Sequence, residues 1–186
     1  MQRPRTTNRN AWIPDEHLKR IAERLTTEDR LICALALQTG YRIEDLLRLT
    51  WAECSHGAIT ARESKTGKTR THVVSDQTAD TLRQLRITVR DRPGAQTYII
   101  PTRRGRAGDK PTLSRWSVWR AFRRAVRDAG LSGYGYTVHS LRKCYAWHLY
   151  RATLSIAAVQ ADLNHDRPET TFVYLREPLE MAARLL

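Results

Sequence analysis

Apolar residues recur at helical spacing along most of this chain, and only one short stretch is rich in residues that favour strands. This periodicity predicts helices that begin at Pro14, Asp76 and Thr112 or Ser114, and further helices over 31–39, 43–49, 138–152, 155–163 and 168–175. The helix from 112 or 114 is expected to reach Ala129 and to bury Trp119, Phe122, Val126 and Ala129. Thr27 is expected to cap the helix over 31–39.

The strand-forming stretch lies between residues 58 and 74. Runs at 58–62 and 71–74 flank Lys65-Thr66-Gly67-Lys68, and this pattern is typical of a β-hairpin or the edge of a small sheet. The sequence therefore predicts a mainly α fold with a small antiparallel β-sheet. With 186 residues, 41% of them hydrophobic, the chain fits one sizeable domain with a continuous core.

Several classes of protein are disfavoured by what the sequence contains. The three cysteines include no C-x-x-C pair, so neither a disulfide framework nor a zinc ribbon is expected. Cys54 and His56 resemble half a metal site, but no second pair stands at ligand spacing, and we expect no metal and no cofactor. The first ten residues are polar and basic, and no apolar run reaches membrane-spanning length. We therefore expect a protein of the cytoplasm, with no membrane partner.

The charge of the chain points to a polyanionic partner. Lys and Arg number 32 against 19 Asp and Glu, which gives a net charge of +13 and a pI near 10.4. Such a surplus attracts nucleic acid and accelerates association with it. A charge that serves solubility, or an acidic protein partner, is the alternative.

Four short segments carry residues suited to phosphate chemistry, although each has an ordinary structural interpretation. Arg42 follows Gly40 at the start of a helix, where it can bind an anion or pair locally with Glu44 or Asp45. Lys65 lies in the hairpin, where it can donate into a groove or remain a solvated turn residue.

The other two segments lie near the end of the chain. His139 and Arg142 are three residues apart on one helix face, where they can share a phosphate or decorate a helix N-terminus. His165 stands nine residues before Tyr174, which by itself reads as a core aromatic.

Taken together, the order Arg, Lys, His-x-x-Arg, His, Tyr resembles the tyrosine recombinase family, also called phage integrases, from about Asp29 to Arg176. The resemblance implies that Tyr174 attacks a DNA phosphate and forms a 3′-phosphotyrosyl link. Arg42 and Arg142 would clamp the phosphate oxygens, because charge grows on them during the attack. His139 and His165 would add hydrogen bonds, and nearby cations would favour the phenolate of Tyr174.

The resemblance also assigns the remaining polar residues. Lys65 would protonate the departing 5′ oxygen, with Lys68 as a substitute, and Asp45 would orient the basic groups. No metal is required, since the arginines supply the charge. Family members usually have Gly where this chain has Asn164, and Asn tolerates the left-handed backbone that such a turn needs.

The domain plan differs from that of many relatives. We expect a loose basic arm over 1–13, the catalytic domain over 14–177 and a helical tail over 178–186. About 25 residues precede the core, too few for the clamp domain of many relatives, so a minimal recombinase or an excised fragment is expected. The amphipathic tail would pack on its own domain or dock on a neighbouring protomer.

DNA affinity would then depend on the catalytic domain itself. The basic loop over 103–110 and the arginines of the helix that follows are the candidate contacts, and most would position the backbone rather than specify bases. A solvated basic face is the alternative. The candidates are Arg103, Arg104, Arg106, Lys110, Arg115, Trp116, Arg120 and Arg124.

The resemblance implies site-specific recombination, by integration, excision or inversion of a DNA segment. The partners would be double-stranded DNA and further copies of the chain, as a dimer on each site and a tetrameric synapse, at the nucleoid. A type IB topoisomerase-like enzyme and a non-cutting DNA-binding regulator are the alternatives.

Overall fold

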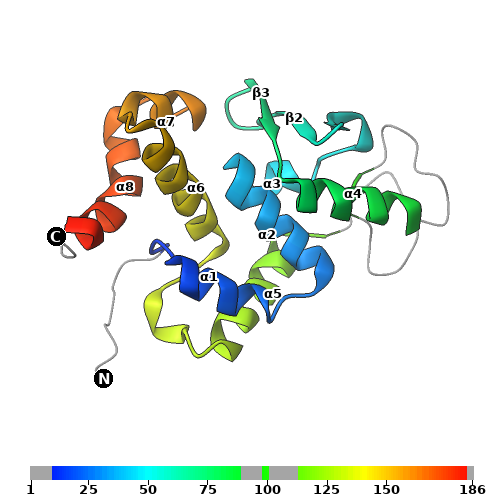
Figure 1. The fold of residues 1–186 in the computed structure, drawn as a ribbon, viewed down its shortest axis with the longest axis horizontal. Helices are drawn as coiled ribbons and strands as arrows, with labels where there is room; N and C mark the ends of the chain where they lie inside the picture. The colour runs from blue at the N-terminus through cyan, green and yellow to red at the C-terminus, as the bar shows by residue number, and fades with distance from the viewer. Residues whose placement is uncertain (1–9, 89–97, 101–112, 184–186) are drawn as a thin grey trace.

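The computed structural model describes residues 10–88, 98–100 and 113–183. Figure 1 shows the chain as a body of packed helices with a small sheet at one side. The helices are α1 (Asp15–Ala22), α2 (Thr27–Thr39), α3 (Ile43–Leu46), α4 (Asp76–Thr88), α5 (Arg115–Asp128), α6 (Val138–Thr153), α7 (Ile156–Asp162) and α8 (Pro168–Ala183), with the 3₁₀ turns Trp51–Glu53 and Ser132–Tyr134. The strands are β1 (Cys54–Ser55), β2 (Ala58–Arg62) and β3 (Thr69–Val73).

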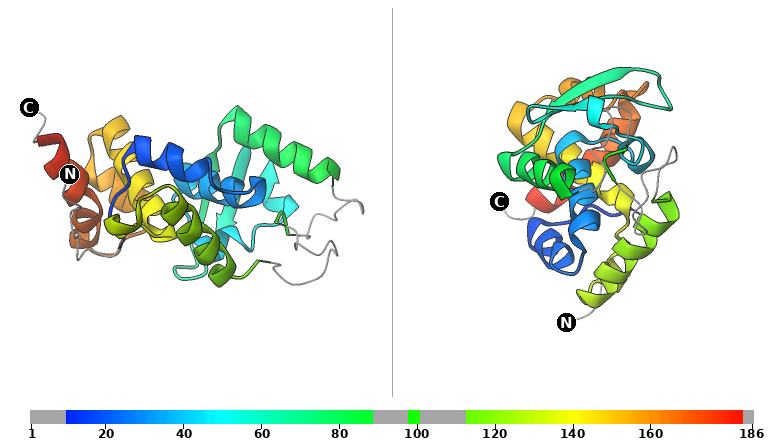
Figure 2. Two further views of the ribbon diagram at one scale, coloured as in Figure 1. Left: turned by 90° about the horizontal axis from the view of Figure 1, so that it is seen from below. Right: turned by 90° about the vertical axis from the view of Figure 1, so that its right-hand side faces the viewer.

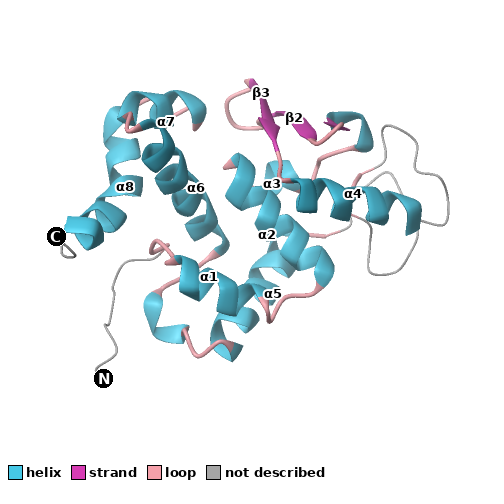
Figure 3. Ribbon diagram, viewed as in Figure 1, coloured by secondary structure: helices cyan, strands magenta, loops and turns pink. Residues whose placement is uncertain are grey.

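The predicted fold class is confirmed. The three strands form one antiparallel sheet in the order β1-β2-β3, with Ile59 opposite His72 and Ala61 opposite Arg70. Figure 3 shows that these strands lie together beside α3 and α4, while the rest of the described chain is helical or loop. The strand β1 is an addition, because two residues are too few to give a periodic signal.

Polar caps set the helix starts. The side chains of Thr26, Ser114, Thr137 and Ser155 accept backbone N–H groups at the first turns of α2, α5, α6 and α7. The expectation that Thr27 caps α2 is wrong by one residue, because the Thr26 side chain accepts from the Asp29 amide at 3.2 Å. The third helix also ends at Leu46 rather than 49, since Leu49 N–H bonds to Leu46 O in a tighter turn.

The core has two parts, and both include residues of α6, whose place among the other helices can be followed in Figure 2. The larger part centres on α2, where Ile32, Leu35 and Ala36 are buried. The smaller part joins α6, α7 and α8. On α5 the buried residues include Phe122 and Val126 as expected, but Trp119 is only half-buried, and its ring stacks on that of the exposed Trp116.

Both ends of the described chain pack on the core, which was one of two alternatives for the C-terminal end and was not expected for the N-terminal end. Ala11 and Ile13, expected in a loose arm, are buried in the core, and the backbone N–H of Trp12 donates to the Glu177 carboxylate at 2.8 Å. At the other end α8 continues through Pro178 to Ala183, with Leu179 packed on its own domain's core. Residues 1–9 and 184–186 lie outside the described residues. Within the described ranges, no helix is both long enough and apolar enough to cross a membrane.

Candidate active site

Five of the six predicted catalytic residues lie in one cluster, in which the two arginines share the buried carboxylate of Glu63. Arg42 and Arg142 pair with it at 3.3 and 3.5 Å. Tyr174 joins this group through His139 and His165, whose ring centroids lie 5.6 and 4.9 Å from its own. The residues come from the α2–α3 junction, the start of α6, the loop before α8, and α8 itself.

The turn that places Arg42 depends on Gly40. This residue ends α2 in the left-handed region at φ 63°, and a Cβ there would lie 2.3 Å from Cδ1 of Tyr145. Arg42 follows as the N-cap residue of α3, with a side chain 24% exposed. The alternative of local pairing with Glu44 or Asp45 is wrong, because Arg42 pairs with Glu63.

Arg142 is held more rigidly than Arg42. Its side chain is 3% exposed, and its guanidinium donates to the backbone oxygens of Gly40 and, at 2.7 Å, Leu163. These bonds fix the charged group where α2, α6 and α7 meet. Burial and the neighbouring Arg42 lower the pKa of Arg142, so a nearby negative charge is required to stabilise its protonated form.

Glu63 supplies this negative charge, and the sequence did not predict its role. Its side chain is fully buried and accepts from Arg70 at 2.9 Å, Thr66 at 2.9 Å and Asn164 at 3.1 Å, besides its pairs with the two site arginines. Burial favours its neutral form, but these hydrogen bonds and the nearby Arg142 and Arg42 outweigh burial and lower its pKa to about 2. An acidic residue at the end of a basic hairpin was the available signal.

Tyr174 and His139 form a neutral hydrogen-bonded pair. The Tyr174 hydroxyl oxygen and Nε2 of His139 are 2.6 Å apart. Burial, Arg142, Lys143 and Arg42 lower the pKa of His139 to about 4, so its ring is neutral at pH 7 and can accept the phenol proton. The cations do oppose the rise in the pKa of Tyr174, but burial outweighs them, contrary to the expected phenolate.

His165 is the second histidine in contact with the ring of Tyr174. Its Nδ1 lies 3.0 Å from Oγ1 of Thr171 in α8, and burial together with Arg142 and Arg42 lowers its pKa to about 4. The preceding Asn164 has φ 51°, so the tolerance of this turn for Asn is confirmed. The Asn164 amide also binds Glu63, a contact that glycine cannot make.

Lys65, the sixth predicted residue, follows Glu63 by two positions, and none of the contacts described above involves it. It is exposed in the turn between β2 and β3. Asp45 accepts the Ser64 amide at 3.0 Å and the Ser64 hydroxyl at 2.6 Å, so it anchors the residue before Lys65 rather than an arginine. Lys68 is also exposed beside the turn.

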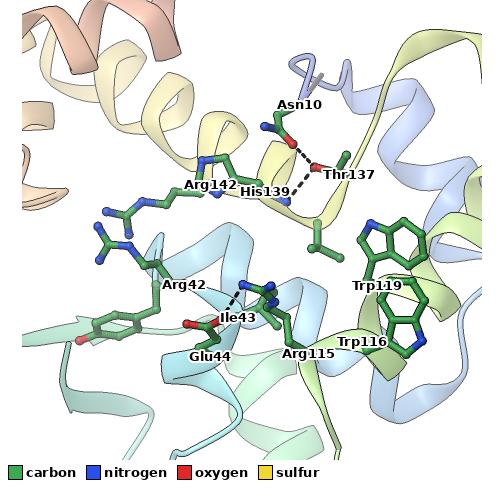
Figure 4. Close-up of a pocket in the computed structure, with 12 residues that line it drawn as sticks. Asn10, Arg42, Ile43, Glu44, Arg115, Trp116, Trp119, Thr137, His139 and Arg142 are labelled. Carbon is green, nitrogen blue, oxygen red and sulfur yellow. Dashed lines mark hydrogen bonds and ion pairs between the residues drawn. The ribbon is translucent and has the colours of Figure 1, made fainter. Parts of the chain in front are cut away.

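A hollow of about 510 Å³ opens beside the two arginines. Figure 4 shows the guanidinium groups of Arg42 and Arg142 near one another at one end of it, with Trp116 and Trp119 at the other. His139 also lines it. An anion in this hollow would meet two guanidinium groups next to the Tyr174–His139 pair.

The predicted DNA contacts are placed in part. Arg103, Arg104, Arg106 and Lys110 lie outside the described residues. On α5, Arg120 and Arg124 are exposed. Arg115 pairs with Glu44 at 2.7 Å at the edge of the hollow, and Trp116 is 58% exposed.

Fold and site together define a helical domain with a paired-arginine anion site beside a tyrosine, and the chain is similar to known proteins in sequence and fold. The model of the phage integrase family matches residues 12–180. Tyrosine recombinase XerA of Pyrococcus furiosus is 29% identical over 169 residues, covering 88% of this chain and 56% of that protein. The chain therefore belongs to the phage integrase family.

Solved structures agree with this family assignment. A lambda integrase dimer bound to a COC′ core site is 28% identical, with a TM-score of 0.69, covering 93% of this chain and 49% of that one. The lambda integrase catalytic core is 27% identical, with a TM-score of 0.64, covering 84% of this chain and 92% of that one. The chain spans about half the length of the curated relatives it matches.

Proposed function

We propose that this chain breaks and rejoins DNA as a site-specific tyrosine recombinase, with Tyr174 as the nucleophile. The observation that carries the proposal is the 2.6 Å contact between the Tyr174 hydroxyl and a neutral His139, beside two arginines that Glu63 holds in place. A nucleophile, a base within hydrogen-bond reach and an anion site are the three parts that phosphoryl transfer needs.

This geometry supports a transfer of the phosphoryl group to Tyr174. A phosphodiester would bind at Arg42 and Arg142, which stabilise the charge that grows on its non-bridging oxygens. The Tyr174 oxygen attacks phosphorus while its proton passes to Nε2 of His139. The bond from phosphorus to the 5′ oxygen breaks, and that oxygen takes a proton from Lys65, with Lys68 as the substitute. The products are a 3′-phosphotyrosyl link and a free 5′ hydroxyl.

The energy of the broken phosphodiester bond is conserved in the phosphotyrosyl link. A 5′ hydroxyl of another strand can therefore attack this link and release Tyr174 without ATP. This reversal is what allows recombination rather than simple cleavage. In this scheme the two arginines supply the positive charge at the phosphate, and His165 orients the tyrosine ring by edge contact.

We infer double-stranded DNA as the substrate and a homo-oligomer as the working form, with a dimer on each site and a tetramer in the synapse. The net charge of +13 and the exposed arginines of α5 support DNA binding. One similar structure is a dimer of lambda integrase bound to a core site, which supports the assembly. The place of action would be the cytoplasm, at the nucleoid.

The test is a covalent capture. Incubation with a pool of nicked duplexes of randomised sequence should trap the enzyme on DNA, because the short cleaved fragment diffuses away. We expect a band of protein joined to DNA on a denaturing gel. Tyr174→Phe should abolish this band, and Tyr150→Phe, a matched change on α6, should retain it. If the protein binds the same DNA but forms no band, the proposed cleavage is wrong and a non-cutting regulator is favoured. An adduct that only nicks and reseals, without exchange between paired sites, would leave a topoisomerase-like enzyme.

A further inference from the structure

Two tryptophans on α5 form a stacked pair at the far end of the hollow from the arginines. The ring centroids of Trp116 and Trp119 are 4.4 Å apart with planes inclined by 15°, and the guanidinium of Arg123 lies 4.8 Å from the ring centroid of Trp119. The spacings of three and four residues place all three on one helix face. Trp116 is thereby held in one orientation by its neighbours.

Trp116 is unusual because its large apolar surface is left open. The side chain is 58% exposed, although an indole contributes most to stability when it is buried. It lines the same hollow as Arg42 and Arg142 (Figure 4). A volume of about 510 Å³ falls in the range of about 300–1,000 Å³ found for sites that take small organic groups.

The charge around the pair favours a nucleic acid over an apolar protein segment. Arg120 and Arg124 are exposed on the same helix as Trp116, and Arg115 lies at the edge of the hollow. Cationic side chains that track a backbone, next to an open aromatic face, are the combination that binds single-stranded nucleic acid. An apolar protein partner would have to cover these charges without compensating them.

We propose that Trp116, backed by Trp119, stacks on an unpaired base of the DNA strand bound in the hollow. The placement of the strand rests on the proposed function, which puts its phosphate at Arg42 and Arg142. Stacking accepts any base, since each has a π face, so the pair stabilises an unpaired nucleotide without reading its identity. A base that is unpaired from its duplex near the cleaved phosphate would stack on Trp116 within the same hollow.

The test compares two single-stranded probes in a Tyr174→Phe background, where no covalent link can form. One is an oligonucleotide of about 12 thymidines, and the other has the same number of phosphates but abasic sugars. Stacking of one base should make the first probe bind about 5-fold or more tightly. Trp116→Ala should bring this ratio close to one, while Trp116→Phe should keep most of it.

Phe172→Ala is the matched control, because Phe172 is also an exposed aromatic, 51% exposed, but lies on α8 outside the lining of the hollow. This variant should keep the ratio. Equal binding of the two probes, or a ratio that survives Trp116→Ala, would overturn the proposal, and equal binding would favour a protein partner for the indole pair. The outcome is separable from the covalent capture, since capture with equal probe binding would sink only the stacking proposal. Tighter binding of the thymidine probe without covalent capture would contradict only the proposed reaction.

Discussion

Replacement of Glu63 by Gln tests whether one buried carboxylate holds the site together. The substitution keeps the shape of the side chain but removes the charge that faces Arg42, Arg70 and Arg142. The pKa of Glu63 is lowered to about 2, against about 4.3 for an unperturbed glutamate, and such a difference corresponds to about 3 kcal/mol of stability. We therefore expect Glu63→Gln to lower the free energy of unfolding by about 3 kcal/mol at pH 7.

The pH dependence gives the sharper test. Because the folded pKa is depressed, the stabilisation by Glu63 is fully present above the unfolded pKa and is lost as the pH falls through the folded value. The gap between the wild type and Glu63→Gln should therefore shrink to about half of its pH 7 value at pH 3.

Urea unfolding followed by circular dichroism at both pH values measures this gap. Glu28→Gln, the same change at an exposed position of α2, should shift stability by no more than about 0.5 kcal/mol. A gap below about 1 kcal/mol at pH 7, or one that does not change with pH, would refute the central role given to Glu63.

Three further results are expected. In thermal unfolding, Gly40→Ala should lower stability by about 1–3 kcal/mol more than Gly57→Ala does. Both glycines have positive φ, but a Cβ at Gly40 would lie 2.3 Å from Tyr145, whereas the nearest contact at Gly57 would be 3.8 Å. Equal losses of stability would contradict this. In the DNA-free protein the imidazoles of His139 and His165 should titrate near pH 4 by NMR, since burial and the arginines lower their pKa. Titration midpoints near 6.5, the value of a free histidine, would contradict this lowering of the pKa. DNA affinity should fall by about 10³-fold or more between about 50 and 200 mM salt if six or more phosphates are contacted, and a flat salt dependence would exclude that mode of binding.

Local signals in the sequence predicted most of the fold. Helix periods, polar caps and the Lys65-Thr66-Gly67-Lys68 turn are properties of neighbouring residues, so they can be recognised without the structure. The errors occurred where tertiary packing decided the outcome. Ala11 and Ile13 read as part of a polar arm but fill the core, and Pro178 reads as a helix boundary but lies within α8.

The site shows the same division. The ordered set from Arg42 to Tyr174 could be recognised because the residue types are distinctive, and five of its six members meet in space. Glu63 has only a weak local signal, its place at the end of a basic hairpin, because its role arises from contacts with residues up to 101 positions away. The raised pKa of Tyr174 was missed for a related reason, since burial depends on the whole fold and outweighs the nearby cations.

The most direct test of the account is to map the atom that carries the DNA. Protein trapped on a nicked duplex can be digested with protease and nuclease, and the peptide that bears a nucleotide can be sequenced by mass spectrometry. We predict a nucleotide 3′-phosphate on the oxygen of Tyr174, in a peptide from α8. A nucleotide on another residue, or a link through a 5′-phosphate, would contradict the proposed chemistry.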